Sequence, residues 1–525
     1  MVDTEEDNQD VNDFKKNKMK RIVQSMLITC FFLTFNASAQ NDVDALRYSV
    51  INYGSTARSL GMGNAFGALG ADLSSMATNP AGIAVFRRSE FSFSPTFTYR
   101  HTQSDFLEGK SNDSKFNFNL GNFGMVWHYN EDDKTKQWKG WSFGIAYNRL
   151  NDFSSKSTAE GTNKNNSLLD SYAETADGTG TSSLQNEFPF DADLAYQSYL
   201  INTTTDSTHF ASVIPHGGEF QSRTLDTKGG QGEWDFSFGT NYNDQLYFGV
   251  TLGIATLNYS EDLSWNEKDK NNTIITSDSL YDFKSFTYSQ SLRTSGNGVN
   301  GKLGVIYRPG DVVRFGLAIH TPTSYTLTDE FATNIKSVVT VKDTNVTDGD
   351  SREWASPDFI PFNYKVITPF HAIGSVAFIL GKQGIISAEY EFTDYNMASL
   401  RVKDVGTGIS FGDVNKTIKK KYAASHTVRL GGEIRADKFR FRLGGSYSTT
   451  PFAKGFNDNS NTDQSRYSVT GGFGFKNDNF YFDVAYAYSH KGSFFKQYTL
   501  NDGNEPGITE NVIDNRLMFT IGFDF

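Results

Sequence analysis

The chain has 525 residues, of which 38% are hydrophobic and 14% aromatic, and its mean hydropathy is -0.47. That average is too polar for a bundle of membrane-spanning helices, whereas many aromatic residues beside 47 glycines are typical of strands with one apolar and one wet face. The net charge of -11 argues against a general nucleic-acid binder, which would need a basic surface.

The N-terminal end has the features of a secretory signal peptide. Residues 19–40 read "MKRIVQSMLITCFFLTFNASAQ", a basic start, an apolar run too short to span a bilayer, and an Ala-Ser-Ala cleavage site at residues 37–39. We therefore assign residues 1–39 to the signal peptide, with residues 1–18 as an extension that precedes a true start at Met19. The only cysteine, Cys30, lies in this segment, so the mature chain would have no disulfide, no thiol nucleophile and no cysteine metal site.

The next segment, residues 40–88, is rich in glycine and lacks the alternation that follows it. Within "SLGMGNAFGALGADLSSMATNPAGIA", the glycines at 61, 63 and 67 have the spacing G-x-G-x-x-x-G. This spacing is one residue longer than the G-x-G-x-x-G fingerprint of dinucleotide sites. Such a site needs a βαβ unit, which no pattern here predicts, so we reject a nucleotide loop. We expect residues 40–88 to fold into the lumen of a barrel as a hatch, where glycines permit close packing and positive φ.

From residue 89 onward the sequence alternates with period two, as in "FSFSPTFTY" and the terminal "LMFTIGFDF". Six connectors are short, and the others are long and polar, residues 151–231 being the longest. This alternation predicts an all-β fold, a 14-stranded antiparallel transmembrane β-barrel over residues 89–525, with both ends of the mature chain at the short-turn, periplasmic end. A soluble β-sandwich fits strands of this length poorly. The fourteen segments start near residues 90, 115, 139, 232, 245, 284, 312, 362, 384, 422, 438, 466, 480 and 515.

The two parities of each strand predict its two faces. Aromatic positions should meet lipid, and the opposite parity should meet the lumen, where charges are tolerated. In the second segment the alternation slips around Gly121-Asn122, which predicts a bulge. The lumenal charges would either tie down the hatch by ion pairs, which we favour, or guide an anionic ligand. They are Arg314, Arg429, Arg440, Arg442, Glu389, Glu433, Glu391, Asp483 and His320.

Three motifs before the first strand carry a resemblance: Ala57-Arg58, Gly61-Met62-Gly63 and Asn79-Pro80-Ala81. With the aromatic strands and the terminal Phe, they resemble the FadL family of fatty-acid and toluene transporters in the Gram-negative outer membrane. The resemblance implies fourteen strands, an N-terminal hatch, and passage of hydrophobic compounds through a lumenal pocket to a lateral opening at a kink in the third strand. Two features depart from it: residues 151–231 are polar where fatty-acid members carry apolar helices, and the alternation slips in the second strand.

The function we expect is passive uptake of a hydrophobic small molecule, fatty-acid-like or aromatic, with Asn79, Pro80 and Ala81 shaping a gate. Arg314, Arg429 or Arg442 could bind a carboxylate head group. Apolar side chains of the hatch would line the ligand path or, alternatively, only pack the hatch against the wall. These side chains are Phe66, Leu69, Met76, Ile83 and Phe86.

Two other functions stay open. Some relatives are labelled haem receptors, and His209 and His216 lie in the longest loop, where they could supply axial ligands. Another relative serves as a shuttle in protein secretion. We expect no enzyme, because neither a nucleophile elbow nor H-E-x-x-H occurs, and no cofactor or metal. The expected partners are the hydrophobic ligand, outer-membrane lipid and, through the strand ending at Phe525, the barrel-assembly machinery; we expect a monomer and no nucleic acid.

Overall fold

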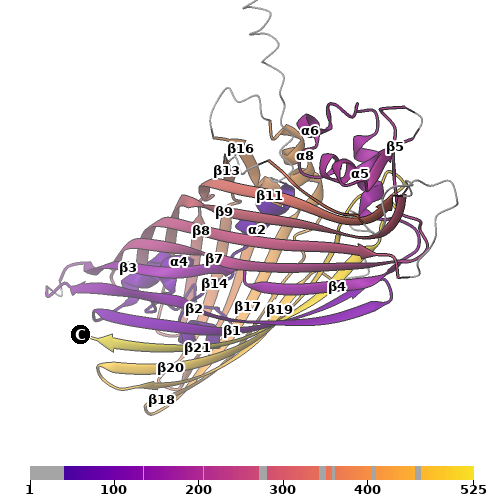
Figure 1. The fold of residues 1–525 in the computed structure, drawn as a ribbon. Helices are drawn as coiled ribbons and strands as arrows, with labels where there is room; N and C mark the ends of the chain where they lie inside the picture. The colour runs from indigo at the N-terminus through magenta and orange to yellow at the C-terminus, as the bar shows by residue number, and fades with distance from the viewer. Residues whose placement is uncertain are drawn as a thin grey trace, which may run out of the picture.

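Long antiparallel strands close on themselves in the computed structural model (Figure 1). The described residues are 41–133, 135–204, 206–270, 281–341, 350–357, 361–403, 410–455 and 463–525, so the predicted signal peptide, with Met19 and Cys30, lies outside them. The first wall strand pairs with the last, from Glu90 opposite Asp524 to Phe106 opposite Ile508, and this ladder closes the barrel.

The wall strands are β1 Glu90–Phe106, β2 Gly109–Asn130, β3 Trp138–Asp152, β4 Ser155–Asn163, β7 Glu219–Tyr242, β8 Leu246–Lys268, β9 Tyr281–Tyr307, β10 Val313–His320, β11 Ser324–Val341, β12 Asp350–Ala355, β13 Phe362–Ile367, β14 His371–Leu380, β15 Gly384–Asp394, β16 Ser399–Val402, β17 Ala424–Ala436, β18 Phe439–Ser448, β19 Arg466–Lys476, β20 Phe480–Lys496 and β21 Gly507–Asp524. Four of the wall strands are interrupted, into β3 and β4, β10 and β11, β12 to β14, and β15 and β16. The described residues thus form fourteen wall strands, and the predicted fold class is confirmed.

The predicted starts near residues 90, 466 and 480 coincide with those of β1, β19 and β20. By contrast, β7 and β21 begin earlier than predicted, at Glu219 and Gly507, because these strands continue beyond the stretch in which aromatic residues alternate.

The outer face of the wall is apolar. Side chains such as Leu303, Ile434 and Leu443 are 63%, 68% and 70% exposed, while Ser92 and Ser142, on the opposite parity, are fully buried. So large an apolar surface would be unfavourable in water and suits hydrocarbon. This barrel is therefore an outer-membrane protein of the Gram-negative type.

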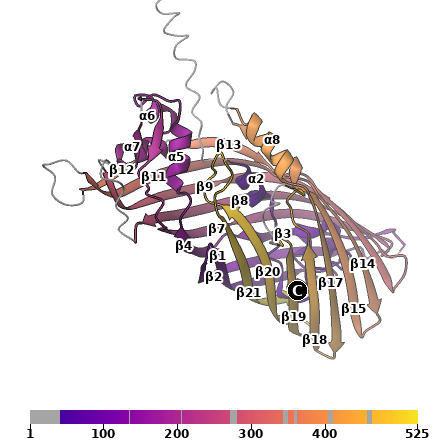
Figure 2. The same cartoon turned by 90° about the vertical axis from the view of Figure 1, so that its right-hand side faces the viewer.

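The two ends of the barrel differ, as the connectors predict. At one end, short turns join neighbouring strands; in the three-residue turn between β7 and β8, Asn243 and Asp244 have φ of 54° and 55°, the left-handed conformation typical of tight hairpin turns. The C-terminus lies at this short-turn end, where the Phe525 amide donates to the Ser89 carbonyl at 3.0 Å. The long connections gather at the other end, which carries α5, α6 and α8 (Figure 2).

The N-terminal segment contains α2 Asp42–Ser49, α3 Ala57–Gly61, α4 Ser75–Thr78 and the 3₁₀ helix η1 Pro80–Val85. Helix α2 lies at the long-loop end, because Tyr422 donates to the Asp42 carboxylate at 2.8 Å and Lys421 pairs with it at 2.7 Å. Both partners flank the end of α8 Gly412–Lys421, so the expectation that both chain ends lie at the short-turn end is wrong for the N-terminal one. Among the described helices, none has the length and apolar character needed to cross a membrane.

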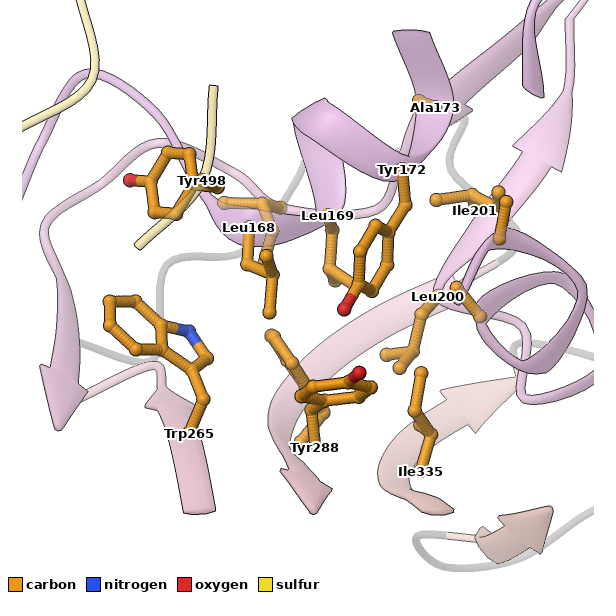
Figure 3. Packing of buried hydrophobic residues seen from close by; sticks show 14 of the residues in the cluster. Leu168, Leu169, Tyr172, Ala173, Leu200, Ile201, Trp265, Tyr288, Ile335 and Tyr498 are labelled. Atoms are coloured by element: carbon orange, nitrogen blue, oxygen red, sulfur yellow. The ribbon is translucent and has the colours of Figure 1, made fainter. Parts of the chain in front are cut away.

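The longest connector, predicted to be a polar loop, contains helices whose apolar residues form a core. Its flanks extend the wall as β4 and the first half of β7, and between them fold α5 Leu168–Ala176, α6 Leu184–Glu187, α7 Ala192–Gln197 and the hairpin of β5 Ile201–Thr203 and β6 Phe210–Ser212. Leu168, Leu169 and Tyr172 of α5 point onto Trp265 and Tyr288 of the extended wall (Figure 3). Apolar residues scattered among polar ones thus form a core once helices pack on strands.

Candidate transport site

The second wall strand carries the predicted bulge. Ser94 of β1 pairs with Asn122, but the next residue, Pro95, pairs with Leu120, so Gly121 is the extra residue of β2. A bulge bends its strand and disturbs the ladder. The sequence prediction at Gly121-Asn122 is confirmed.

The third wall strand is also kinked, at the same height. Its register against β7 shifts between Arg149 and Asn151, and the strand is interrupted between β3 and β4. The ladder between β2 and β3 ends at Asn122 opposite Asn148. Beyond that pair, among the described residues, β2 pairs only with β1 and β4 only with β7, so the wall has a break in its backbone ladder here.

Side chains bridge this break, which we call the seam. The Asn117 and Asn119 amides donate to the Asp152 carboxylate at 2.8 and 3.2 Å, and Lys115 pairs with Asp226. Arg100 donates to the Ser154 carbonyl at 2.8 Å. Contacts of this kind can separate without opening a ladder of backbone hydrogen bonds, so the seam is the weakest line of the wall.

The N-terminal segment covers the seam from inside. The backbone amides of Asn52 and Gly54 donate to the carbonyls of Leu150 and Arg149 at 2.7 and 2.6 Å, as a short added strand would. A Cβ at Gly54 would lie 2.7 Å from the Gly121 carbonyl, so only glycine fits between the two strands.

The glycines of the first motif seat the segment on the wall. Gly63 has a φ of +64°, and a Cβ there would lie 2.6 Å from the Gly445 amide nitrogen. A Cβ at Gly61 would lie 3.2 Å from the Cα of wall residue Gly472. The motif therefore brings backbone against backbone, which a nucleotide loop would not need.

The predicted gate residues fix the second half of the segment. The Asn79 side chain donates to the Gly67 carbonyl at 2.6 Å and accepts from the Ala81 amide at 3.1 Å. Pro80 follows as the first residue of η1, where its missing N–H leaves no bond unmade. Asn79 thus ties the glycine-rich turn to η1.

The predicted apolar residues of the segment are all buried against the wall. Phe66 and Leu69 pack with Ala377 and Ile385, and the other three, Met76, Ile83 and Phe86, pack with Val126 and Ala146. These contacts support the alternative in which they pack the hatch, and their contact with a ligand stays a prediction.

The lumenal charges form buried networks. Arg429 pairs with Glu389 at 2.9 Å and with Glu391 at 2.5 Å, and Glu389 accepts from the Gly67 amide at 2.8 Å. His371 lies 2.8 Å from Glu391. The first network therefore holds the N-terminal segment.

A second network lies on neighbouring strands. Arg442 pairs with Glu433 at 2.9 Å and with Asp483 at 2.6 Å, and Arg58 of the segment approaches Glu433 at 3.5 Å. With the first network, these ion pairs support the favoured role of tying down the hatch.

Two of the predicted lumenal arginines stand outside these networks. Arg314 donates to the Leu69 carbonyl at 2.8 Å, which also holds the segment. Arg440 donates only to the carbonyls of Asp437 and Phe439, at the short turn. Arg440 therefore does not join the other lumenal charges.

A small cavity of about 20 Å³ lies between the segment and the wall. Tyr53, Lys302, His320 and Tyr325 are among its lining residues, and Lys302 pairs with Glu233 and Asp235. This volume holds a water molecule but no organic ligand. None of the predicted apolar hatch residues lines it.

Neither loop histidine is arranged for haem. His209 is exposed and lies 2.9 Å from Asp206, and His216 lies 3.6 Å from Asp170. Within the part of the chain that the structure describes, no three His, Cys, Asp or Glu side chains are grouped to hold a metal ion.

Sequence reasoning missed the seam residues Asn117, Asn119 and Asp152. It also missed inward cations on β19 to β21, such as Arg466 and Arg516. The cations could have been identified from alternation, because they directly precede Tyr467 and Leu517, which face outward. The seam depends on pairing between strands, which no local pattern encodes.

No family model matches the chain, and no curated protein matches it. Solved structures do. The toluene transporter TodX of Pseudomonas putida matches with a TM-score of 0.48 and 12% identity, over 91% of this chain and 100% of its own. The toluene transporter TbuX of Ralstonia pickettii matches with a TM-score of 0.46 and 13% identity, over 89% of this chain and 98% of its own. A FadL homologue of Pseudomonas aeruginosa matches with a TM-score of 0.52 and 12% identity, over 91% of this chain and 99% of its own. The resemblance read from the sequence motifs is therefore confirmed at the level of the fold, and this chain has the fold of that FadL homologue.

Proposed function

We propose that this protein is an outer-membrane channel for passive uptake of hydrophobic small molecules, with residues 40–88 as the hatch and the seam as the lateral exit. The observation that carries the proposal is the seam: a wall break bridged by side chains and covered from inside by Asn52 and Gly54. A barrel with no lateral exit would be more stable with a continuous ladder of backbone hydrogen bonds, so the break indicates a function.

The direction of transport follows from the compartment. The outer membrane has no ATP, and the chain has no nucleotide motif, so transport runs down a gradient. A hydrophobic ligand enters from the long-loop end, outside the cell, and leaves sideways into the lipid, so that it never crosses the short-turn end. The hatch closes that end against solutes.

The gate in this proposal is Asn79 with Pro80 and Ala81. Asn79 donates to the Gly67 carbonyl and lies 3.4 Å from the Val305 carbonyl of β9, so it connects the hatch to the wall. Release of these bonds would let the two halves of the hatch move apart. The apolar side chains beneath, from Phe66 to Phe86, would then face the opened path.

The other functions receive less support. An enzyme would need a reactive group in an open pocket, and where the hatch meets the wall the lumenal charges form ion pairs that hold structure. The carboxylates beside His209 and His216 would orient an axial haem ligand as readily as they pair a solvated histidine, so co-purification decides the haem alternative. The partners in this proposal are the hydrophobic ligand, outer-membrane lipid and the barrel-assembly machinery, which would recognise the strand ending at Phe525. The protein would act as a monomer.

The seam can be tested by reversible cross-linking, because the mature chain has no cysteine of its own. Asn117→Cys with Asp152→Cys places thiols on both sides of the seam. A bifunctional methanethiosulfonate reagent should abolish uptake of labelled dodecanoate and toluene by cells, and a reductant should restore it.

The matched control is Ser446→Cys with Ser468→Cys, two hydroxyls 2.7 Å apart across an intact ladder. Cross-linking there should leave uptake unchanged. Unchanged uptake through a cross-linked seam would exclude the lateral exit. Mass spectrometry of what co-purifies in mild detergent separates the functions: a lipid or aromatic compound supports transport, whereas haem or a stoichiometric protein contradicts it.

A further inference from the structure

Three cations on the inner face of the wall lack any partner. Arg466 of β19, Lys491 of β20 and Arg516 of β21 make no hydrogen bond or ion pair with the residues that the structure describes, although other inward-facing arginines, such as Arg429 and Arg442, are paired. We call these three residues the cation cluster.

Strand parity places the cation cluster in the lumen. The next residues along the strands, Tyr467 and Leu517, are exposed on the outer face at 41% and 37%, and His490 stacks on Tyr467 with ring centroids 5.2 Å apart. The cluster residues therefore point inward. Lys491 is nevertheless exposed, so the lumen beside it is open to solvent.

Arg466 lies close enough to each of the other two cations to repel it. Arg466 pairs directly with Lys491 across the two strands, and its charge also interacts with that of Arg516. Like charges opposite each other on neighbouring strands are destabilising, so this arrangement costs stability in the absence of an anion.

The nearby anions do not compensate the cluster. Asp514 is held by Arg100 in a two-bond pair at 2.6 and 2.9 Å, and Asp152 is held by the two seam asparagines. Glu510 has one buried oxygen without a partner and interacts with Lys491 at longer range. The three cations then face two carboxylates that no cation neutralises directly, Asp152 and Glu510, since the asparagine amides that hold Asp152 are neutral.

The hatch leaves this side of the lumen open at the long-loop end. Helix α2 packs on the opposite wall, where Tyr48 meets Tyr259 and Phe153 with ring centroids 6.2 Å apart in both pairs. On the side of the cation cluster, α3 reaches the level of Arg516, because Leu60 packs beside Ala487, which pairs with Arg516, whereas Arg466 and Lys491 lie four residues nearer the long-loop end. A ligand can therefore reach the cluster from the long-loop end.

We propose that the cation cluster binds the head group of an amphiphile carrying two negative charges, of the phosphate-ester class. The three cations offer more free N–H donors than the two oxygens of a carboxylate accept, whereas a phosphate ester brings about two charges and three acceptor oxygens at pH 8. Arg100 contacts both Asp514, near the cation cluster, and the Ser154 carbonyl at the seam. The bound head group would therefore lie beside the seam, through which the apolar tail of the ligand would leave. This inference rests on the proposed function.

The test is a binding titration of the purified protein in phosphate-free buffer at pH 8. Dodecyl phosphate, dodecanoate and dodecanol share a chain and differ in head-group charge. Dodecyl phosphate should bind more tightly than both others. Arg466→Gln, Lys491→Gln or Arg516→Gln should each weaken its binding about tenfold while leaving dodecanol unchanged. Arg440→Gln, at the short turn, should bind like the native protein, and heat-dependent gel migration verifies that each variant is folded.

Equal affinity for dodecyl phosphate and dodecanoate would overturn the inference, and so would native affinity for dodecyl phosphate in the variant that combines Arg466→Gln, Lys491→Gln and Arg516→Gln. In either case, binding of dodecanol would still support the channel. Inorganic phosphate that competes as strongly as dodecyl phosphate would replace the amphiphile with a free anion. If none of the three twelve-carbon probes binds, the proposed function itself is contradicted.

Discussion

Replacing Gly444 of β18 with valine should release the hatch. A Cβ at this inward position would lie 2.8 Å from the Met62 carbonyl oxygen and closer still to the Gly63 amide nitrogen. Both are backbone atoms, which cannot rotate away as a flexible side chain would. Gly63 already has a φ of +64°, so the turn has little freedom to move.

Overpacking of this kind costs about 1–3 kcal/mol. If that cost falls on the seated hatch, the ratio of unseated to seated molecules rises about 5-fold to 150-fold. Planar-bilayer recordings should then show frequent large openings that the native protein rarely makes. Gly374→Val is the control, because a Cβ there meets no atom within 4 Å. Native conductance in Gly444→Val, with the variant folded, would refute the seating of the hatch on wall glycines.

Four further outcomes are expected. Deletion of residues 42–86 should give large, unselective conductance in planar bilayers; unchanged conductance would place the segment outside the pore. Asn79→Ala should lose three hydrogen bonds, destabilise the hatch by about 1–3 kcal/mol, and raise the rate of spontaneous channel opening. Leu169→Ala should weaken the packing of α5 by about 2–5 kcal/mol and expose residues 164–218 to protease. Burial raises the pKa of Glu267, beyond the apolar band of β8, to about 7, so ionisation above its ordinary 4.5 opposes packing of α5. The protection of α5 amides from hydrogen exchange, corrected for the intrinsic rate at each pH, should therefore fall from pH 4.5 to 7 in the native protein but not in Glu267→Gln.

Much of the fold could be predicted because the barrel has a local code. Period-two alternation distinguishes lipid from lumen at every strand, and short turns such as Asn243-Asp244 punctuate it. The interruptions of the wall had weaker signals. Pro322 and Pro369 mark two of the gaps, between β10 and β11 and between β13 and β14, but a proline alone does not say whether a strand ends or resumes.

The site was predicted unevenly for a physical reason. The hatch motifs are contiguous in the sequence, and Gly63 and Asn79 could be singled out because their residue types permit close backbone approach and local hydrogen bonding. The lumenal arginines were predicted to face inward, but their partners lie on other strands. That Arg429 and Arg442 are consumed by ion pairs, while Arg466 is not, depends on register across five strands, which a single sequence does not reveal.

The seam raises a question about the cargo. An exit for a purely apolar compound needs no charge along its edge, yet Lys115, Arg100 and Asp152 line this one. Lys115 and Asp152 lose their partners across the seam once it parts, whereas Arg100 keeps Asp514. Unpaired charges in a lipid-facing gap are costly, so Lys115 and Asp152 would each need a new partner. A cargo with a charged head group would supply that partner as it passes, and a toluene-like compound would not. The polar edge and the cation cluster therefore favour the same class of ligand: an amphiphile whose charge is held at the wall while its apolar chain enters the membrane.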